Sequence, residues 1–201
     1  MKEKILTKAT DLFLNLGFKS VTMDDIANAM GISKKTIYAH FKNKTELVKA
    51  STFFLFDVIC DGIDIICSEE KNPIQELYEI KSFAMKHLKD EKSSPQYQLQ
   101  KYYPKIYETL KFKQFEIMKD CVSKNLERGV ELKLYRENLN IDFITRIYFN
   151  GMIGIKNKEL FPQEKFTMKT LMEDYLEYHL RGITTEKGLQ FLTTFLTENE
   201  N

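Results

Sequence analysis

Hydrophobic residues recur every three to four positions along most of the chain, which is the spacing of one face of an α-helix. Short polar stretches with glycine or proline separate the periodic segments, and such stretches are typical of turns. The pattern predicts an all-α protein of about 9–10 helices. The predicted helices cover residues 2–16, 22–30, 33–41, 45–68, 74–89, 96–110, 111–136, 140–156, 167–181 and 185–197, and residues 90–95 form the clearest loop.

The stretch TMDDIANAMGISKKTIYAHFKNKTEL, from Thr22 to Leu47, has the features of two short helices joined by a tight turn. Thr22 is a suitable N-cap, and two aspartates follow in the first turn, where the helix dipole favours negative charge. Gly31 tolerates the left-handed backbone that ends a helix, and Ser33 supplies a second N-cap. These features predict a helix-turn-helix motif. The helix at 2–16, which ends at Gly17, is expected to pack behind the two helices of the motif.

In the second helix of the motif, Ile37 and Phe41 are four residues apart and share one face, so we expect both to pack inward. That packing leaves Lys35 and Ala39 pointing outward. The other outward positions are Lys34, Thr36, Tyr38 and Lys42, with His40 and Lys44 towards the rim. A cationic, polar and aromatic face suits the major groove of DNA, and the rim positions suit phosphate contact.

The positions that define this motif are Gly17-Phe18, Thr22, Asp25-Ile26-Ala27, Gly31-Ile32-Ser33, Ile37-Tyr38, His40-Phe41, Lys44 and Glu46-Leu47. Their spacing resembles the DNA-binding domain of the tetracycline-repressor (TetR) family of bacterial transcription regulators. The resemblance implies a homodimeric, ligand-responsive repressor of a palindromic operator, with a helical C-terminal half. It also implies DNA contacts from Thr22, Ser33, Lys34, Lys35, Thr36, Tyr38, His40 and Lys44.

One position departs from the family pattern. Lys35 occupies a place that is often glycine or another small residue in TetR proteins. A long cation changes which base edge is read, so the operator sequence does not follow from the resemblance.

Charge is unevenly distributed along the 201 residues. The first 50 residues hold nine lysines and five acidic residues, a net charge of +4, so the remainder carries −3 against a total of +1. Positive charge is therefore concentrated where DNA is expected. Hydrophobic residues make up 43% of the chain, which is sufficient for a core.

Several features indicate a cytoplasmic protein that is nucleoid-associated when bound to DNA. The N-terminus lacks an apolar signal core, and three aspartates interrupt the apolar run at 53–67, which excludes a membrane span there. Three cysteines argue against a disulfide framework and for a reducing compartment. We expect Cys60 and Cys67 to be packing residues, with redox or metal roles as the alternative.

The sequence predicts two domains: a helix-turn-helix DNA-binding domain at 1–48 and an effector-binding and dimerisation domain at 49–201. The helix at 45–68, with Thr45 as its expected cap, contributes to both. In the TetR family such a helix carries ligand-induced movement to the DNA-binding domain. Gly62 inside it marks either a bend or a close contact.

Large, soft side chains are frequent in the middle of the chain and are suited to line a mostly apolar effector pocket. The predicted pocket residues are Phe83, His87, Tyr102, Tyr103, Tyr107, Phe115, Met118, Tyr148 and Met152. For each of them, ordinary core packing is the alternative interpretation.

A recognition helix reads only a half-site, so two must lie about 34–36 Å apart, or a multiple of that, and this requires a dimer. In TetR-like proteins two late helices of each subunit form a four-helix bundle, here predicted at 140–157 and 167–181. The predicted interface residues are Ile144, Ile147, Gly151, Leu171, Tyr175, Leu176 and His179.

Two other classes of function remain as alternatives. An enzyme would need a Gly-rich phosphate loop, a nucleophile elbow or clustered metal ligands. The sequence has neither of the first two, and its three histidines are not spaced as metal ligands. No cofactor or metal is therefore expected. The second alternative is a DNA-binding dimer without a small-molecule effector, controlled by a protein partner or acting architecturally. A closed, well-packed core among residues 80–155 would favour it.

Overall fold

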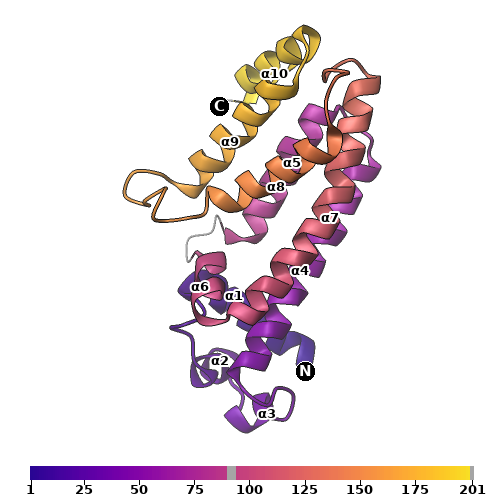
Figure 1. Ribbon diagram of the computed structural model, residues 1–201. Coiled ribbons are helices and arrows are strands. Elements are labelled where there is room, and N and C mark those ends of the chain that lie inside the picture. Colours follow the sequence, from indigo (N-terminus) through magenta and orange to yellow (C-terminus); the bar gives the residue numbers. More distant parts are fainter. Residues whose placement is uncertain (90–93, 200–201) are drawn as a thin grey trace. The chain divides into compact units, whose positions relative to one another are not determined.

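The computed structural model describes residues 1–89 and 94–199, and within these ranges every regular element is an α-helix (Figure 1). The predicted all-α fold is therefore confirmed. The helices are α1 (Lys2–Leu16), α2 (Met23–Met30), α3 (Lys34–Tyr38), α4 (Lys44–Ser68), α5 (Pro73–His87), α6 (Pro95–Tyr102), α7 (Pro104–Glu131), α8 (Ile141–Gly154), α9 (Met168–Ile183) and α10 (Glu186–Asn199). Of the loop predicted at 90–95, residues 90–93 lie outside the described residues.

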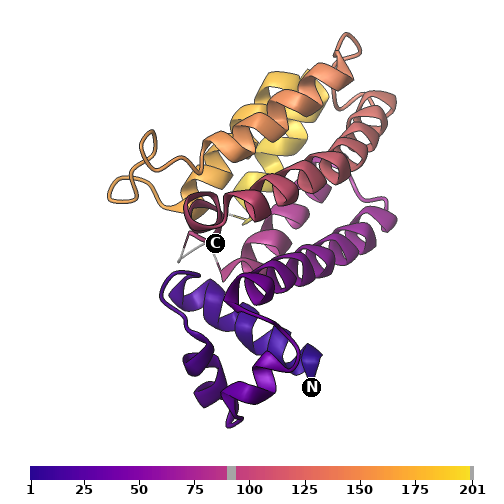
Figure 2. The same ribbon diagram turned by 60° about the horizontal axis from the view of Figure 1, so that its bottom comes forward.

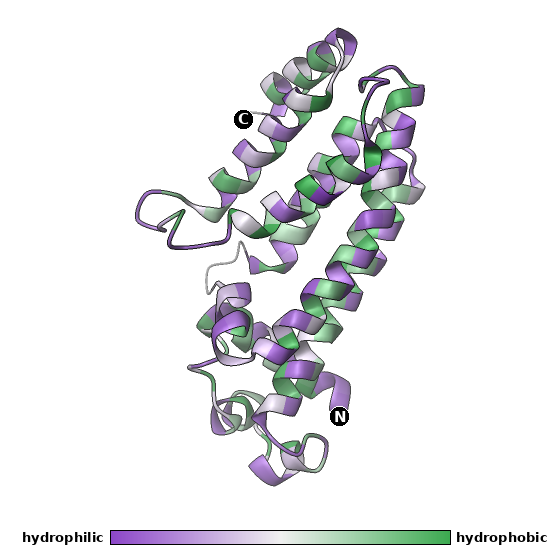
Figure 3. Cartoon of the chain, viewed as in Figure 1, coloured by the Kyte–Doolittle hydropathy of each residue, from purple (hydrophilic) through white to green (hydrophobic). Residues whose placement is uncertain are grey.

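Apolar and polar residues alternate around the helices at helical spacing, as Figure 3 shows. Each helix therefore has an apolar face to pack inside its own part of the molecule. Across the described residues, no helix combines the length and apolar character needed to cross a membrane.

The chain forms two compact units, which are considered separately. Unit 1 comprises Met1–Asp61 and Ala84–Lys113, and unit 2 comprises Gly62–Phe83 and Gln114–Asn201. Helices α4, α5 and α7 contribute residues to both units. Unit 1 contains the predicted DNA-binding residues 1–48 together with later parts of the chain. The compact units therefore do not coincide with the predicted functional domains, and the division at residue 48 stays a prediction.

Unit 1 is built around one apolar core beneath α1, α2 and α3, which Figure 2 shows gathered beside the first turns of α4. Its most deeply buried members are Ile5, Phe13, Ile26, Ile37, Phe41 and Leu47. The same core includes Leu99 of α6 and Ile106, Tyr107 and Leu110 of α7. Residues far along the chain thus help to hold the helix-turn-helix segment together.

The helix predicted at 96–110 was expected to be kinked or split by Pro104, and it is split there, whereas the second predicted break, between residues 110 and 111, lies inside α7. The helix ends at Tyr102, and Pro104 starts α7. Proline disfavours helical backbone at the residue before it and is well suited to a first helical position. Tyr103 accordingly leaves the helical region, with φ −136° and ψ 54°.

Helix α7 also ends earlier than the predicted residue 136. Lys133 has a positive φ of 60°, and the amides of Leu134 and Tyr135 both donate to the carbonyl of Gly129. A Cβ on Gly129 would lie 1.9 Å from the Tyr135 ring, so a side chain there would collide with it. Gly129 is therefore a close-contact position. The helix predicted at 167–181 continues to Ile183, so Gly182 lies inside α9.

Unit 2 has its own apolar core, formed by α5, α7, α8, α9 and α10. Within it lies a buried polar cluster around Glu76, which is 1% exposed. Its carboxylate accepts hydrogen bonds from Asn125 at 2.7 Å and Arg128 at 2.9 Å. Tyr135 donates to the Asn125 side-chain oxygen at 3.2 Å, which completes the cluster. The start of α5 is thereby fixed to the end of α7.

Removing this buried carboxylate should destabilise the protein. In Glu76→Ala, Arg128 and Asn125 each lose a charge-assisted partner, and we expect a loss of about 3 kcal/mol, near the lower end for broken buried pairs because Arg128 is partly exposed. Urea denaturation followed by circular dichroism measures it. The control Asp142→Ala breaks an exposed ion pair with Arg146 and should leave the midpoint nearly unchanged. Similar urea midpoints for Glu76→Ala and Asp142→Ala would contradict the stabilising role assigned to the Glu76 cluster.

Candidate DNA-binding site

The first helix of the motif begins with a capping box. The Thr22 hydroxyl accepts a hydrogen bond from the Asp25 amide at 3.1 Å, and the Asp25 carboxylate accepts one from the Thr22 amide at 2.8 Å. This backbone hydrogen bond, followed by that from the Thr22 hydroxyl, lowers the pKa of Asp25. Gly31 ends α2 with left-handed backbone, φ 64° and ψ 31°. The predicted cap and stop are confirmed.

The second helix of the motif, α3, is short and begins as predicted. The Ser33 hydroxyl accepts a hydrogen bond from the Thr36 amide at 3.1 Å. The helix ends at Tyr38, so Phe41 lies in the following turn rather than inside the helix. Ile37 and Phe41 are nevertheless 0% and 2% exposed, which confirms the predicted inward pair.

Most of the predicted DNA contacts lie on the surface of unit 1. Exposed side chains are Thr22, Ser33, Lys34, Lys35, Tyr38 and His40, while Thr36 and Lys44 are partly buried. Lys34 forms an ion pair with Asp24 at 2.8 Å, and the hydrogen bond to Asp24 raises the pKa of Lys34. Tyr38 exposes 43% of its surface.

Lys44 has an internal contact that the sequence did not indicate. Its ammonium donates to the carbonyl of Lys19 at 3.2 Å, and burial lowers the pKa of Lys44. Helix α4 starts at Lys44, and its cap is Asn43, whose side-chain oxygen accepts from the Glu46 amide at 2.8 Å. The predicted cap at Thr45 is therefore wrong.

Helix α6 packs against the turn between α1 and α2, a contact that periodicity did not reveal. The Gln98 side-chain oxygen accepts from the Lys19 amide at 3.1 Å, and the Tyr103 ring meets Phe18 edge-on at 6.3 Å. At Gly17, which has φ 88°, a Cβ would lie 2.3 Å from the Gln98 amide nitrogen. Glycine is thus required there for both backbone angle and space.

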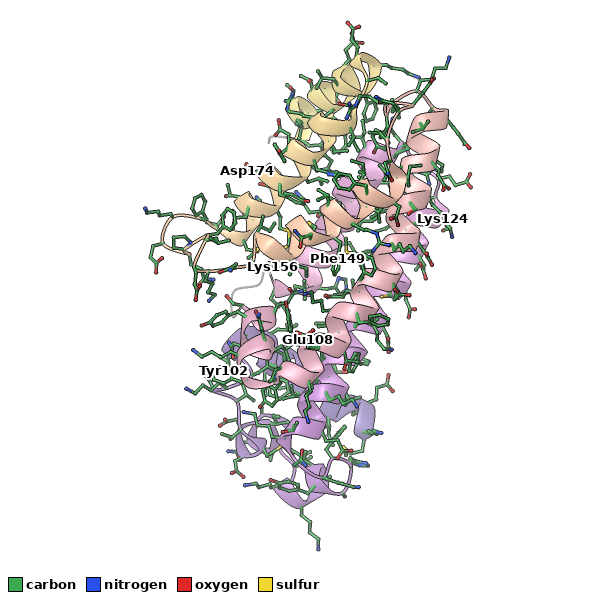
Figure 4. All side chains as sticks on the ribbon, viewed as in Figure 1. Tyr102, Glu108, Lys124, Phe149, Lys156 and Asp174 are labelled. Carbon is green, nitrogen blue, oxygen red and sulfur yellow. The ribbon has the colours of Figure 1, made fainter. Side chains whose placement is uncertain are left out.

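The predicted effector residues divide between the two units. His87, Tyr102, Tyr103 and Tyr107 belong to unit 1, and Phe83, Phe115, Met118, Tyr148 and Met152 belong to unit 2. Tyr102, labelled in Figure 4, is an exposed residue with the Lys19 and Lys101 ammonium groups near its ring. Tyr107 is buried in the core of unit 1. The predicted set does not form one site within either unit.

In unit 2, aromatic side chains of α8 and α9 are in contact. The rings of Tyr148 and His179 lie 4.6 Å apart, and Tyr148 stacks on Tyr175 at 5.9 Å. The Tyr175 hydroxyl donates to backbone carbonyls of α8, including that of Tyr148 at 3.0 Å. The buried Tyr78 hydroxyl makes no hydrogen bond within the described part of the chain.

Three predicted dimer residues are buried within the chain itself. Leu171, Leu176 and His179 are 6%, 1% and 7% exposed because α9 directs its apolar face into the core of unit 2. They pack in the core of their own subunit, and an interface role for them stays a prediction. A partly buried Gly151 lies beside the Tyr175 hydroxyl, and Ile144 packs against the same core.

Other large apolar side chains of α8 and α9 remain on the surface. Ile147, a predicted interface residue, is 46% exposed. Phe143, one helical turn earlier, is 56% exposed, and Tyr178 of α9 is 77% exposed. Phe143 and Tyr178 were not among the predicted interface residues because they lie outside the regular apolar spacing of α8 and α9.

The fold and the motif define an all-helical helix-turn-helix protein, and comparison with known proteins agrees. The family described as "Bacterial regulatory proteins, tetR family" matches residues 5–51. The biofilm operon icaADBC HTH-type negative transcriptional regulator IcaR of Staphylococcus aureus (strain Newman) is 33% identical over 79 residues, which are 39% of this chain and 42% of IcaR. IcaR of Staphylococcus epidermidis is 36% identical over 61 residues, which are 30% of this chain and 33% of that protein. These matches span less than half the length of either relative.

Solved structures share the whole fold at low sequence identity. A TetR-family transcriptional regulator from Agrobacterium tumefaciens has a TM-score of 0.71 and 18% identity, covering 92% of this chain and 97% of that one. SmeT, the repressor of the Stenotrophomonas maltophilia multidrug efflux pump SmeDEF, has a TM-score of 0.62 and 16% identity, covering 92% and 91%. Residues 5–51 thus match the TetR family of bacterial regulatory proteins, and the fold of the chain is that of solved TetR-family regulators.

The buried histidine of α9 should make stability depend on pH. Burial lowers the pKa of His179 to about 4, whereas an unfolded histidine titrates near 6.5. As the pH falls from 6.5 towards 4, the unfolded chain takes up a proton that the folded chain excludes, so the folded state loses stability. We expect the full loss to be roughly 3 kcal/mol.

Urea denaturation of wild type and His179→Phe between pH 7 and pH 4 tests this expectation. The variant should lack the part of the pH dependence that His179 contributes. The control His40→Gln replaces an exposed histidine and should follow wild type. Parallel curves for wild type and His179→Phe would refute the assignment.

Proposed function

We propose that this protein is a transcriptional repressor that binds a palindromic operator as a homodimer and is released by a small, mostly apolar effector. The observation that carries the proposal is the orientation of α3: Ile37 is fully buried, while Lys34, Lys35 and Tyr38 face outward. Repression is supported by the relatives, since IcaR is described as a negative regulator and SmeT as a repressor. The expected location is the cytoplasm, at the nucleoid when DNA is bound.

The outer face of α3, here called the recognition helix, has the chemistry of a major-groove reader. Lys35 is suited to guanine edges, and Tyr38 to a phosphate or a base edge. Lys34 must exchange its Asp24 partner for phosphate, and such exposed ion pairs contribute little stability that would oppose the exchange. Lys44 also closes the turn at Lys19, so its substitution would mix structural and DNA effects.

Dimerisation through α8 and α9 is supported by exposed apolar side chains rather than by the buried ones. Phe143 and Ile147 are four residues apart on one face of α8, and Tyr178 is on α9, which packs against α8. A contiguous exposed apolar patch is typical of a surface that binds another protein, and we expect these side chains to form one. A second copy supplies the same chemistry by symmetry.

The effector site is best supported in unit 2. Tyr78 has a buried hydroxyl without a partner in the described structure, and an unpaired buried polar group is costly unless a ligand satisfies it. The neighbouring core contains Tyr148, Tyr175 and Met152. We therefore expect an apolar effector that carries one hydrogen-bonding group.

Substitutions on the recognition helix should separate sequence reading from general affinity. Lys35→Ala should reduce the preference for operator over unrelated DNA by about 1–3 kcal/mol, because a base contact is lost. Tyr38→Ala should weaken binding to all duplexes alike, because a positioning contact is lost. The operator is first obtained by selection from random duplexes, and affinities are then measured by fluorescence anisotropy over a range of salt concentrations.

The logarithm of the wild-type association constant should fall linearly with the logarithm of the salt concentration, with a slope of about −0.9 per phosphate contact. The control Lys124→Ala removes an exposed lysine of unit 2, labelled in Figure 4, and should bind as wild type does. Equal losses for Lys35→Ala and Tyr38→Ala on every sequence would refute the assigned roles.

Charges placed on the exposed face of α8 should prevent dimerisation. The double variant Phe143→Asp, Ile147→Asp introduces four charges per dimer into the proposed interface, so sedimentation velocity should show a monomer where wild type is dimeric. The control Leu160→Asp alters a side chain that is 69% exposed, beyond the end of α8. A wild-type monomer at micromolar concentration, or a dimeric double variant, would exclude this interface.

A further inference from the structure

Two cysteines of unit 2 are in contact, although they are far apart in the sequence. Cys67 lies in the last turn of α4 and Cys121 lies within α7. Their sulfur atoms are 3.4 Å apart, both thiols are free, and both are partly buried. The third cysteine, Cys60, lies two helical turns before Cys67 and belongs to unit 1.

We propose that Cys67 and Cys121 form an oxidation site that closes to an intrachain disulfide when a hydroperoxide or a reactive disulfide supplies the oxidising equivalents. The observation behind the proposal is the direct contact of the two sulfurs from different helices. A disulfide has a sulfur–sulfur distance of about 2.05 Å, so the sulfurs must approach by roughly 1.3 Å. Rotation of the two side chains and a small shift between α4 and α7 provide that movement.

The chemistry with a hydroperoxide balances in two steps. The thiolate of one cysteine attacks the terminal peroxide oxygen, the O–O bond breaks, and an alcohol or water leaves, which gives a sulfenic acid. The neighbouring sulfur then attacks the sulfenic sulfur, the S–O bond breaks, and water leaves. Two thiols are oxidised by two electrons, and the peroxide is reduced by the same two.

The surroundings of the pair favour a slow but specific reaction. Burial raises the pKa of both thiols, and the carboxylates of Asp64 and Glu76 act in the same direction. The thiolate is therefore scarce at neutral pH, which limits the first step. The second step is fast because the partner sulfur is already in contact, so the disulfide outcompetes further oxidation of the sulfenic acid.

A metal site is a weaker explanation for the same pair. Within the described ranges, no group of three or more His, Cys, Asp or Glu side chains is arranged to hold a metal ion. Two thiols alone leave a tetrahedral ion such as zinc incompletely coordinated. The oxidation proposal needs no further ligand.

The test uses the full chain, reduced and then treated with hydrogen peroxide or, separately, with diamide. Remaining thiols are alkylated under denaturing conditions, and the intact mass and the peptide map are recorded without reduction. We expect a monomer that carries one alkyl group, where the reduced chain carries three, and that is lighter by a further amount of about 2 Da because two thiol hydrogens are lost; the peptide map should show one linked peptide joining Cys67 to Cys121 and an alkylated Cys60. The melting temperature should rise and return to its starting value after dithiothreitol, because the bond closes a long loop.

Three variants complete the test. Cys60→Ser is the matched control and should form the same disulfide, whereas Cys67→Ser and Cys121→Ser should not. Helicity and melting temperature of the reduced variants show whether each is folded, and the wild-type peptide map is informative without them. Three alkylated thiols after diamide, a bond to Cys60, an intermolecular bond, or sulfinic acid in place of the disulfide would each overturn the proposal. None of these readouts involves DNA, so the outcome is separate from that of the proposed function.

Discussion

Burial of Ile37 and Phe41 in unit 1 is the interaction on which the candidate DNA surface depends. Helix α3 has only five residues, and a helix of that length is not stable alone because nucleation costs more than one turn of hydrogen bonds returns. It persists because its inner face is packed and Ser33 caps its start. The same packing determines what remains outside, so Lys35 and Tyr38 are exposed as a consequence of where the two apolar side chains are buried.

Features determined by neighbouring residues were predictable from the sequence. The caps at Thr22 and Ser33 follow from the reach of a side-chain hydroxyl to an amide three residues on, and the stop at Gly31 follows from backbone freedom. The start of α4 was misassigned because Asn43 and Thr45 are both acceptable caps. The structure selects Asn43 because its oxygen accepts from the Glu46 amide, while the Glu46 carboxylate accepts from the Lys42 amide.

Features determined by tertiary packing were not predictable in the same way. The amphipathic pattern of α9 identified Leu176 and His179 as apolar-face residues, but such a pattern is identical whether the face meets its own core or a second copy. The aromatic residues after position 100 were grouped as one pocket because they are close in sequence. Tyr102 is instead exposed and Tyr107 is buried in the core of unit 1, because side chains five residues apart point in different directions on a helix or across a helix break.

The composition of the unit 1 core suggests how later parts of the chain influence DNA binding. Leu99 and Ile106 are buried in the same core as Ile37, and Gln98 holds the amide of Lys19 in the turn before α2. Protein interiors are densely packed, so a displacement of α6 or of the start of α7 must be accommodated by the residues that hold α3. For the effector response proposed above, contact between an effector and the recognition helix would therefore not be required. A change in the position of these few α6 and α7 residues within unit 1 would be sufficient.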